Sequence, residues 1–214
     1  MTSPSTKTRL LDAAEVLYAE YGFAETSMRE LTRAAGVNLS AVNYHFGSKE
    51  GLFRELFARR FEPINAARLA ELDRLEAAGE PNLEDVLEAL VAPILELRLR
   101  DPRLASLVVQ IAASLTGGKS CPTEGLGEVF RQTSERFMAA LRRCLPQVPE
   151  REQLWRLHCT ISVMIGTLLD PHGCLASTVL EGDPRAEREL LADLVAFLAA
   201  GLRAPVGLGE EESS

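Results

Sequence analysis

Apolar residues recur every three to four positions along almost the whole chain, and no stretch alternates apolar and polar residues for long enough to indicate a β-strand. The apolar segments are short up to about residue 50 and long after it. The pattern therefore predicts an all-α protein of nine helices: three short ones, a fourth that links them to the rest, and five longer ones. The longer helices are expected over residues 83–99, 102–116, 123–145, 150–169 and 184–203.

Capping residues predict where the short helices begin and end. Ser27 and Glu30 fit the S-x-x-E capping box, and the helix that they open stops at Gly36. Asn38 can cap a third helix, which runs to about His45. Ser48 and Asn82 can cap the fourth and fifth helices in the same way.

Glycine and proline suggest further boundaries. The first helix is expected to end at Gly22, with Tyr21 and Phe23 in the core. Pro63 should kink or end the fourth helix, which resumes after it. We expect a compact domain over residues 1–50, a helical domain over 51–205 and a disordered tail over 206–214.

The second and third helices are joined through "AAGVN", which is helix-turn-helix spacing. Gly36 sits where the tight turn needs a positive φ, and Val37 fills the corner between the helices. In this motif the second helix enters the major groove of DNA and presents side chains to base edges. Val42 and Phe46 lie four residues apart and should face inward. The rest of that helix is then free to contact DNA.

The outward-facing side chains suit both bases and phosphates. Asn43 can pair with an adenine edge, and Ala41 offers a methyl group to thymine. Thr26 and Ser27 can serve as helix caps or phosphate contacts, and Arg29 can contact phosphate or pair with a neighbouring glutamate. The full set of candidate DNA-binding residues is Thr26, Ser27, Arg29, Asn38, Ser40, Ala41, Asn43, Tyr44, His45 and Lys49.

The charge distribution is compatible with a DNA partner. Residues 1–62 carry eight basic and eight acidic side chains, so the whole net charge of −8 lies in residues 63–214. A local basic face in the first third can meet phosphate, while the acidic remainder disfavours non-specific binding.

The stretch "LLDAAEVLYAEYGFAETSMRELTRAAGVNLSAVNYHFGSKEGLF" resembles the DNA-binding domain of TetR-family transcriptional regulators over about residues 7–55. Where the family often has Thr or Ser and then Leu-Tyr, this chain has Ala41-Val42-Asn43. The variant "N-x-x-A-V-N-Y-H-F-G-S-K", together with "LWRLH" at 154–158, is similar to the PsrA-like, fatty-acid-responsive branch. The resemblance implies an N-terminal three-helix helix-turn-helix domain and a C-terminal helical bundle for ligand binding and dimerisation.

The resemblance also implies a homodimer that binds operator DNA as a repressor and releases it when a small hydrophobic effector enters the bundle. Among hydrophobic effectors, the similarity to the PsrA-like branch favours a fatty acyl chain. The last two helices should form the dimer contact, through Leu190, Leu191, Leu194, Val195, Phe197 and Leu198. Apolar stripes in the bundle are either a filled core or the wall of an effector pocket. The candidate pocket residues are Val108, Ile111, Leu115, Phe137, Leu141, Trp155, His158, Cys159 and Met164.

Several other classes of protein are disfavoured. No phosphate-binding glycine loop, nucleophile elbow or H-E-x-x-H occurs, so we do not expect an enzyme. His172 and Cys174 offer too few donors for a metal, and no cofactor is expected. The polar N-terminus and the lack of a long apolar run predict a cytoplasmic protein without a membrane segment, in which the four cysteines are reduced. The alternative function is a helical protein–protein interaction module.

Overall fold

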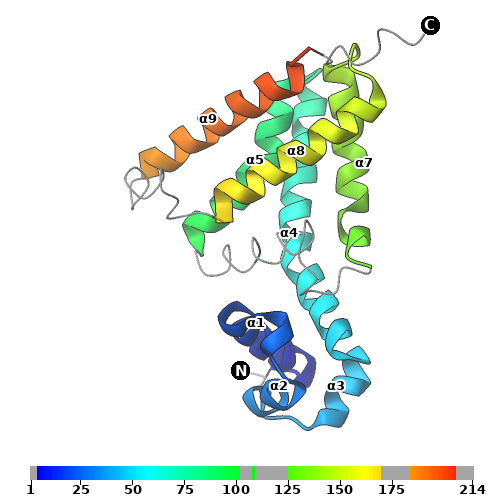
Figure 1. The fold of residues 1–214 in the computed structure, drawn as a ribbon, viewed down its shortest axis with the longest axis vertical. Coiled ribbons are helices and arrows are strands. Elements are labelled where there is room, and N and C mark those ends of the chain that lie inside the picture. Colours follow the sequence, from blue (N-terminus) through cyan, green and yellow to red (C-terminus); the bar gives the residue numbers. More distant parts are fainter. Residues whose placement is uncertain (1–3, 102–107, 109–124, 170–183, 206–214) are drawn as a thin grey trace, which may run out of the picture. The chain divides into compact units, whose positions relative to one another are not determined.

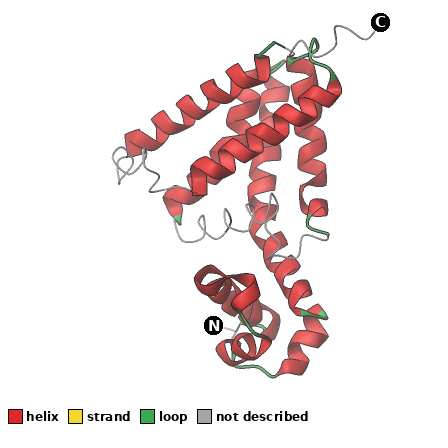
Figure 2. Ribbon diagram, in the orientation of Figure 1, coloured by secondary structure: helices red, strands yellow, loops and turns green. Residues whose placement is uncertain are grey.

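The computed structural model describes residues 4–101, 108, 125–169 and 184–205. These residues form eight helices, with no strand among them (Figures 1 and 2), which confirms the predicted all-α fold class. The helices are α1 (Thr6–Glu25), α2 (Met28–Ala35), α3 (Leu39–Phe46), α4 (Lys49–Ala78), α5 (Leu83–Arg100), α7 (Gly127–Cys144), α8 (Glu150–Leu169) and α9 (Pro184–Arg203). The helix expected over 102–116 lies outside the described residues except for Val108, which is helical and buried.

The chain divides into two compact units. The first contains Met1–Ala66 and Leu97–Gln132, and the second contains Ala67–Glu96 and Thr133–Ser214. Within the described ranges, no helix has the length and apolar character that crossing a membrane requires.

The predicted caps form the helix ends. The Ser27 hydroxyl accepts a hydrogen bond from the Glu30 N–H at 3.2 Å, and the Glu30 carboxylate accepts one in return from the Ser27 N–H at 2.8 Å. Ser48 and Asn82 accept from the backbone N–H groups three residues ahead of them, at 3.1 and 2.9 Å. Because the first N–H groups of a helix have no partner within the helix, these bonds fix where α2, α4 and α5 start.

Two boundaries differ in detail from the prediction. Gly22 has φ 82° and ψ 168°, so it breaks the helical conformation as expected, although a last turn continues α1 to Glu25. Pro63 does not end the fourth helix, because α4 continues through it. A proline inside a helix costs roughly 3 kcal/mol. Phe61 and Ile64 are buried on either side of Pro63, and their packing offsets part of that cost.

An aromatic cluster fills the core of the first unit. The ring of Phe57 stacks on that of Phe61, with centroids 4.3 Å apart, and both rings contact Phe130 edge-on. The ring centroids of Phe23 and Phe53 lie 5.1 Å apart, so Phe23 joins this core, as predicted. Tyr21 does not join it: its side chain is 56% exposed and its hydroxyl donates to Glu20. The break at Gly22 turns the chain, so Phe23 points inward and Tyr21 outward.

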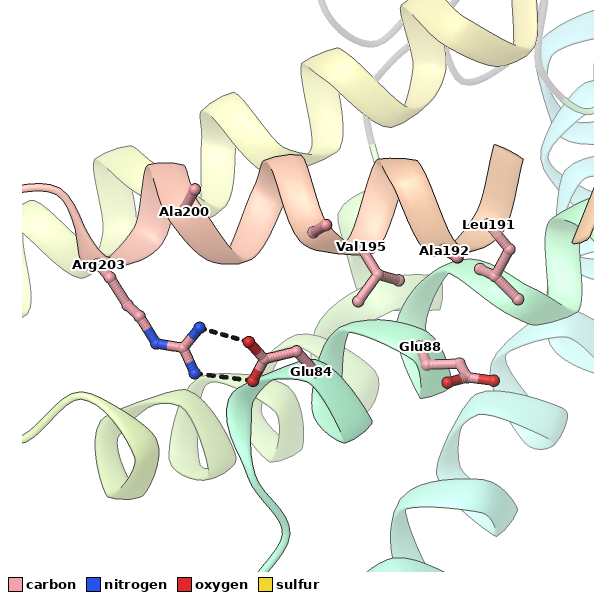
Figure 3. A pocket seen from close by; sticks show the side chains of 8 residues that line it. Glu84, Glu88, Leu191, Ala192, Val195, Ala200 and Arg203 are labelled. Atoms are coloured by element: carbon pink, nitrogen blue, oxygen red, sulfur yellow. Dashed lines mark hydrogen bonds and ion pairs between the residues drawn. The ribbon is translucent and has the colours of Figure 1, made fainter. Parts of the chain in front are cut away.

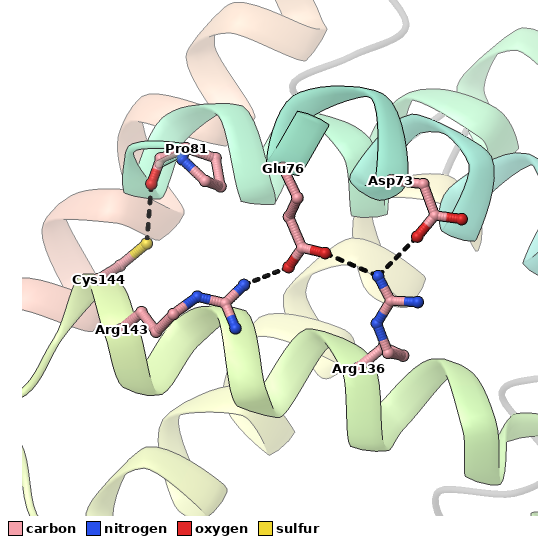
Figure 4. Close-up of polar contacts among 6 residues, drawn as sticks. All are labelled: Asp73, Glu76, Pro81, Arg136, Arg143 and Cys144. Carbon is pink, nitrogen blue, oxygen red and sulfur yellow. Dashed lines mark hydrogen bonds and ion pairs between the residues drawn. The ribbon is translucent and has the colours of Figure 1, made fainter. Parts of the chain in front are cut away.

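Ion pairs and an apolar interior hold the second unit together. Arg136 of α7 lies 2.6 Å from Asp73 and 2.8 Å from Glu76, both on α4, and Arg143 also pairs with Glu76 (Figure 4). Between α8 and α9, Arg156 of α8 is buried and donates to two carbonyl groups at the end of α9, those of Leu202 and Ala204, at 2.7 Å each. The acceptors are C-terminal carbonyls that α9 cannot satisfy itself, so Arg156 joins α8 to α9.

Candidate nucleic-acid interface and the interior of the second unit

The turn between α2 and α3 has the geometry that its glycine predicts. Gly36 adopts φ 62° and ψ 40°, the left-handed conformation, and its N–H bonds to carbonyls at the end of α2. Arg9 of α1 donates to the carbonyls of Ala35 and Gly36, which ties the turn to α1. The sequence analysis missed Arg9, since a single arginine near the start of a helix carries no local signal for a contact 26 residues away.

Gly36→Ala should lower the free energy of unfolding by roughly 1–2 kcal/mol, because a Cβ is disfavoured in the left-handed region. A Cβ at this position would also lie 2.7 Å from Nη2 of Arg9, so the arginine would have to move. Urea denaturation measures the change. Gly127→Ala is the control: nothing lies within 4 Å of a Cβ there, and its effect should stay within about 0.5 kcal/mol. Equal effects of the two substitutions would contradict this role of Gly36.

Helix α3 presents a polar face to solvent. Asn38 caps it: its side-chain oxygen accepts from the Ala41 N–H at 3.0 Å and from the Ser40 hydroxyl at 2.7 Å. Val42 is fully buried and Phe46 half-buried, so α3 is held in place from its inner side as predicted. The exposed candidates on this helix are Ser40, Asn43, Tyr44 and His45, with Ala41 half-buried between them.

Tyr44 is the most exposed of these side chains. It is 86% accessible, and its ring meets that of His45 edge-on at 5.0 Å. Its hydroxyl can donate and accept hydrogen bonds. Tyr44 therefore adds a polar group to the exposed face of α3 that carries Ser40 and Asn43.

Lys49, at the start of α4, reaches back toward the first helix. Its Nζ lies 4.3 Å from the centroid of the Phe23 ring and 3.4 Å from the Ala24 carbonyl oxygen. The cation–π contact positions the ammonium group at the surface. An ammonium group has three N–H donors, so it can still contact an anion.

The remaining candidates, Thr26, Ser27 and Arg29, lie at the start of α2 and differ in exposure. Thr26 is buried, and its hydroxyl donates to the Gly22 carbonyl at 2.8 Å, so the structure gives its side chain a capping role and removes it from the surface set. Ser27 is exposed but serves the capping box. Hydrogen bonds from Ser27 lower the pKa of Glu30. Arg29 is exposed and makes no ion pair with any described residue, which leaves it available to phosphate.

In the second unit, the candidate pocket residues fall into three groups. Phe137, Leu141 and Met164 are buried, and Cys159 is half-buried. Trp155 is 60% exposed, and His158 is exposed and stacks on it, so neither faces the interior as the sequence analysis expected. Ile111 and Leu115 lie outside the described residues, and Val108 belongs to the first unit.

Trp155 and His158 were assigned to the interior because α8 has apolar residues on more than one side. Arg156, Leu157, Thr160 and Met164 form its inward row, so residues offset from this row point outward. Periodicity finds such a helix but does not tell which of its faces is buried within the same chain.

A charged side chain that the sequence analysis missed lies in the interior of this unit. Arg68 of α4 is 6% exposed, its Nε donates to the Leu90 carbonyl of α5 at 2.8 Å, and its Nη2 lies 4.0 Å from the Met164 sulfur of α8. The only available signal was its spacing, four residues from both Ile64 and Leu72, which are buried.

An open groove of about 790 Å³ runs between α5 and α9 (Figure 3). The apolar side is formed by α9, including Leu191 and Val195, and one end is closed by the ion pair of Arg203 with Glu84. None of the candidate pocket residues lines this groove. Among the described residues, no cluster of His, Cys, Asp and Glu has the arrangement of a metal site.

Known protein families match both parts of the chain. The model described as "Bacterial regulatory proteins, tetR family" matches residues 10–56, and the model "Tetracyclin repressor-like, C-terminal domain" matches residues 88–201, more than half of the chain. The chain belongs to the TetR family of bacterial regulators. This places it among transcription regulators rather than enzymes.

Curated TetR-family relatives match parts of the chain. It is 24% identical to the HTH-type transcriptional regulator AcrR of Shigella flexneri over 145 residues, 65% of this chain and 64% of AcrR. It is 37% identical to the HTH-type transcriptional repressor AcnR of Corynebacterium glutamicum over 74 residues, 33% of this chain and 39% of AcnR. The chain thus spans less than two thirds of the length of these relatives.

Solved TetR-type structures share the fold over nearly the full length. The fatty acid degradation regulator FadR from Bacillus halodurans superposes with a TM-score of 0.64 and 15% identity, covering 96% of this chain and 100% of FadR. NalD, the secondary repressor of the MexAB-OprM multidrug efflux pump in Pseudomonas aeruginosa, superposes with a TM-score of 0.57 and 22% identity. The match covers 92% of this chain and 94% of NalD. At these identities the similarity establishes the fold alone.

The outer faces of α8 and α9 in this TetR-family chain carry large exposed apolar side chains. Leu154 and Trp155 of α8 and Phe197 of α9 are each more than half exposed. Leu194, Val195 and Leu198, which the sequence analysis assigned to a dimer contact, are instead buried within the chain itself. They form the buried face of α9, whereas Phe197 lies outside that face.

Proposed function

We propose that this TetR-family chain is a sequence-specific DNA-binding regulator that reads its operator with the exposed face of α3. The observation that carries the proposal is this capped helix, held by buried Val42, with Asn43 and Tyr44 directed outward. Eight residues at about 1.5 Å each give a length near 12 Å, which matches the major groove, about 12 Å wide.

The side chains divide by chemistry into base and phosphate contacts. Asn43 has the amide that pairs with an adenine edge, and the Ser40 hydroxyl, which donates to Asn38, keeps its oxygen free to accept a hydrogen bond. Tyr44 and Lys49 suit phosphate, as does Arg29. Phosphate contacts set the position of the protein on DNA, whereas base contacts select the sequence.

A dimer follows from the size of the reading helix. One short helix contacts few bases, so two copies should sit one DNA turn apart or a multiple of it, about 34 Å per turn. We assign the dimer contact to the outer faces of α8 and α9, because large apolar side chains in water disfavour the isolated chain. A twofold pairing brings each of these faces against its own copy.

Repression with release by a hydrophobic effector is the mode of regulation that we favour. The printed descriptions of FadR and NalD name a fatty acid degradation regulator and a repressor of a multidrug efflux pump. Phe137, Leu141 and Met164 supply buried apolar surface in the second unit, which suits the apolar part of such effectors. A ligand releases DNA only if it binds the two states unequally, and a factor of 100 in DNA affinity corresponds to about 2.7 kcal/mol of coupling.

Selection of binding sites from random DNA, followed by gel shifts, tests DNA recognition. Asn43→Ala should cost about 1–3 kcal/mol on the selected site and relax preference at one base position. Lys49→Ala should weaken binding to all DNA sequences about equally. It should also reduce the slope of log affinity against log salt concentration by about one unit. The two variants therefore separate base reading from phosphate binding.

Arg74→Ala is the control, because Arg74 is exposed in the second unit and pairs with Glu71; its affinity and salt slope should equal those of the wild type. If selection yields no motif, or if Asn43→Ala keeps the full base preference, this reading of α3 is wrong. Absence of any DNA shift would favour the interaction-module alternative.

A further inference from the structure

A large apolar side chain outside the set of candidate DNA-binding residues is exposed at the start of α3. Leu39 is the first residue of this helix, and its side chain is 51% exposed. It lies between two exposed polar residues, Asn38 and Ser40, and one helical turn before Asn43. Because residues four apart are neighbours on the surface of a helix, Leu39 and Asn43 belong to the same exposed face.

The packing of α3 does not require Leu39. At the start of a helix, an apolar residue just before the cap commonly packs against the fourth residue of the helix. Val37 and Val42 occupy these two positions, and they are half-buried and buried. Asn38 supplies the cap, since its side-chain oxygen accepts from the Ala41 N–H. The helix is therefore capped and anchored by other residues, while half of the Leu39 side chain stays in water.

The position of Leu39 on the reading helix suits one particular base group. A single exposed leucine is ordinary on a protein surface, but the N-terminal residues of a helix in the major groove meet the base edges. The C5-methyl group of thymine is the apolar group that bases present there, and apolar side chains contact it. Leu39 offers a larger exposed apolar surface for this contact than Ala41, which is half-buried.

We propose that Leu39 is a specificity-determining residue that selects a thymine in the operator through apolar contact with its C5-methyl group. The assignment rests on the proposed function, in which α3 reads DNA with Asn43. Four residues at about 1.5 Å each separate Leu39 from Asn43 by about 6 Å along the helix, and successive bases are about 3.4 Å apart. The selected thymine therefore lies within about two base pairs of the base that Asn43 reads.

Gel shifts with the operator selected from random DNA test this contact when single thymines are replaced by uracil. Uracil keeps the base pair and its hydrogen-bonding groups and lacks only the methyl group. For the wild type, this replacement at the selected thymine should weaken binding about fourfold, the factor for burial of one methyl group. Leu39→Ala should bind the thymine operator roughly 5- to 10-fold more weakly than the wild type, and it should bind the uracil operator as well as the thymine one.

Two further variants control for a loss of structure. Leu39→Met keeps an apolar side chain of similar volume and should retain most of the preference for thymine over uracil. Val16→Ala truncates an apolar residue of α1 that is 62% exposed, so its affinity and its response to uracil should equal those of the wild type. Melting curves establish that each variant is folded.

The outcomes separate the role of Leu39 from DNA reading by α3. If Asn43→Ala changes the base preference, but the wild type and Leu39→Ala respond equally to uracil, reading by α3 stands and the role of Leu39 is wrong. The role of Leu39 also fails if the wild type is insensitive to uracil at every thymine within about two base pairs of the base that Asn43 reads. If selection yields no motif, the proposed function and the role of Leu39 fail together.

Discussion

Phe197→Glu should convert the proposed dimer into monomers at micromolar concentration and weaken operator binding by at least about a hundredfold. Phe197 is 66% exposed on α9, and around a twofold axis the substitution enters the contact twice. An unpaired carboxylate buried at an interface costs several kcal/mol, whereas a factor of ten in affinity needs only about 1.4 kcal/mol. Light scattering measures the mass, and a gel shift measures the affinity.

Trp155→Glu on α8 should have the same effect, since its ring is exposed on the neighbouring helix. Val16→Glu is the matched control: this apolar residue of α1 is 62% exposed, but it lies in the first unit, and its substitution should leave the dimer mass unchanged. If Phe197→Glu and Trp155→Glu both remain dimers, the contact lies elsewhere on the chain.

Phe57→Ala should lower the free energy of unfolding by about 3–5 kcal/mol, the range for truncating a large buried aromatic residue. The Phe57 side chain is fully buried and contacts the rings of Phe53, Phe61 and Phe130. Its removal takes away both the buried area and the aromatic contacts, and the packed neighbours cannot close the cavity. Urea denaturation at a fixed chain concentration measures the change.

Phe57→Leu, which keeps most of the volume, should cost clearly less than Phe57→Ala. Tyr44→Ala removes an aromatic ring of similar size from a position that is almost fully exposed. Its effect on stability should stay within about 0.5 kcal/mol. A loss in Tyr44→Ala comparable to that in Phe57→Ala would show that the aromatic cluster is not what stabilises the first unit.

Local chemistry made the helix boundaries predictable. The caps at Ser27, Asn38 and Asn82 form within three residues of the side chain involved, and α8 and α9 have the bounds that periodicity indicates. Gly36 was assigned correctly because the conformation of a tight turn is a property of a few adjacent residues. Pro63 was harder to interpret, since packing on both sides of it decides whether a helix continues.

The candidate site was predictable on α3 and much less so in the second unit. On a short helix with one buried residue, Val42, the outward face follows directly from the spacing. The apolar surface of α8 and α9 extends around more than one side, so the sequence did not distinguish the row that packs within the chain from the row that faces outward. For that reason Trp155 was predicted to face the interior but is exposed, and Leu194 was predicted to face a partner but is buried within the chain.

The sequence by itself determined the helical fold and the exposed face of α3 that carries Asn43, because capping, periodicity and turn chemistry act over at most one or two helical turns. Only the tertiary structure decided that Arg9 supports the turn, that Lys49 lies over Phe23, and that Arg68 is buried beside Met164. The contacts of Arg9 with Ala35 and Gly36 join residues 26 and 27 positions apart, and the contact of Arg68 with Met164 joins residues 96 positions apart. Whether a charged side chain lies in water or in the interior depends on which helix covers it, and that is fixed by packing between elements distant in the chain.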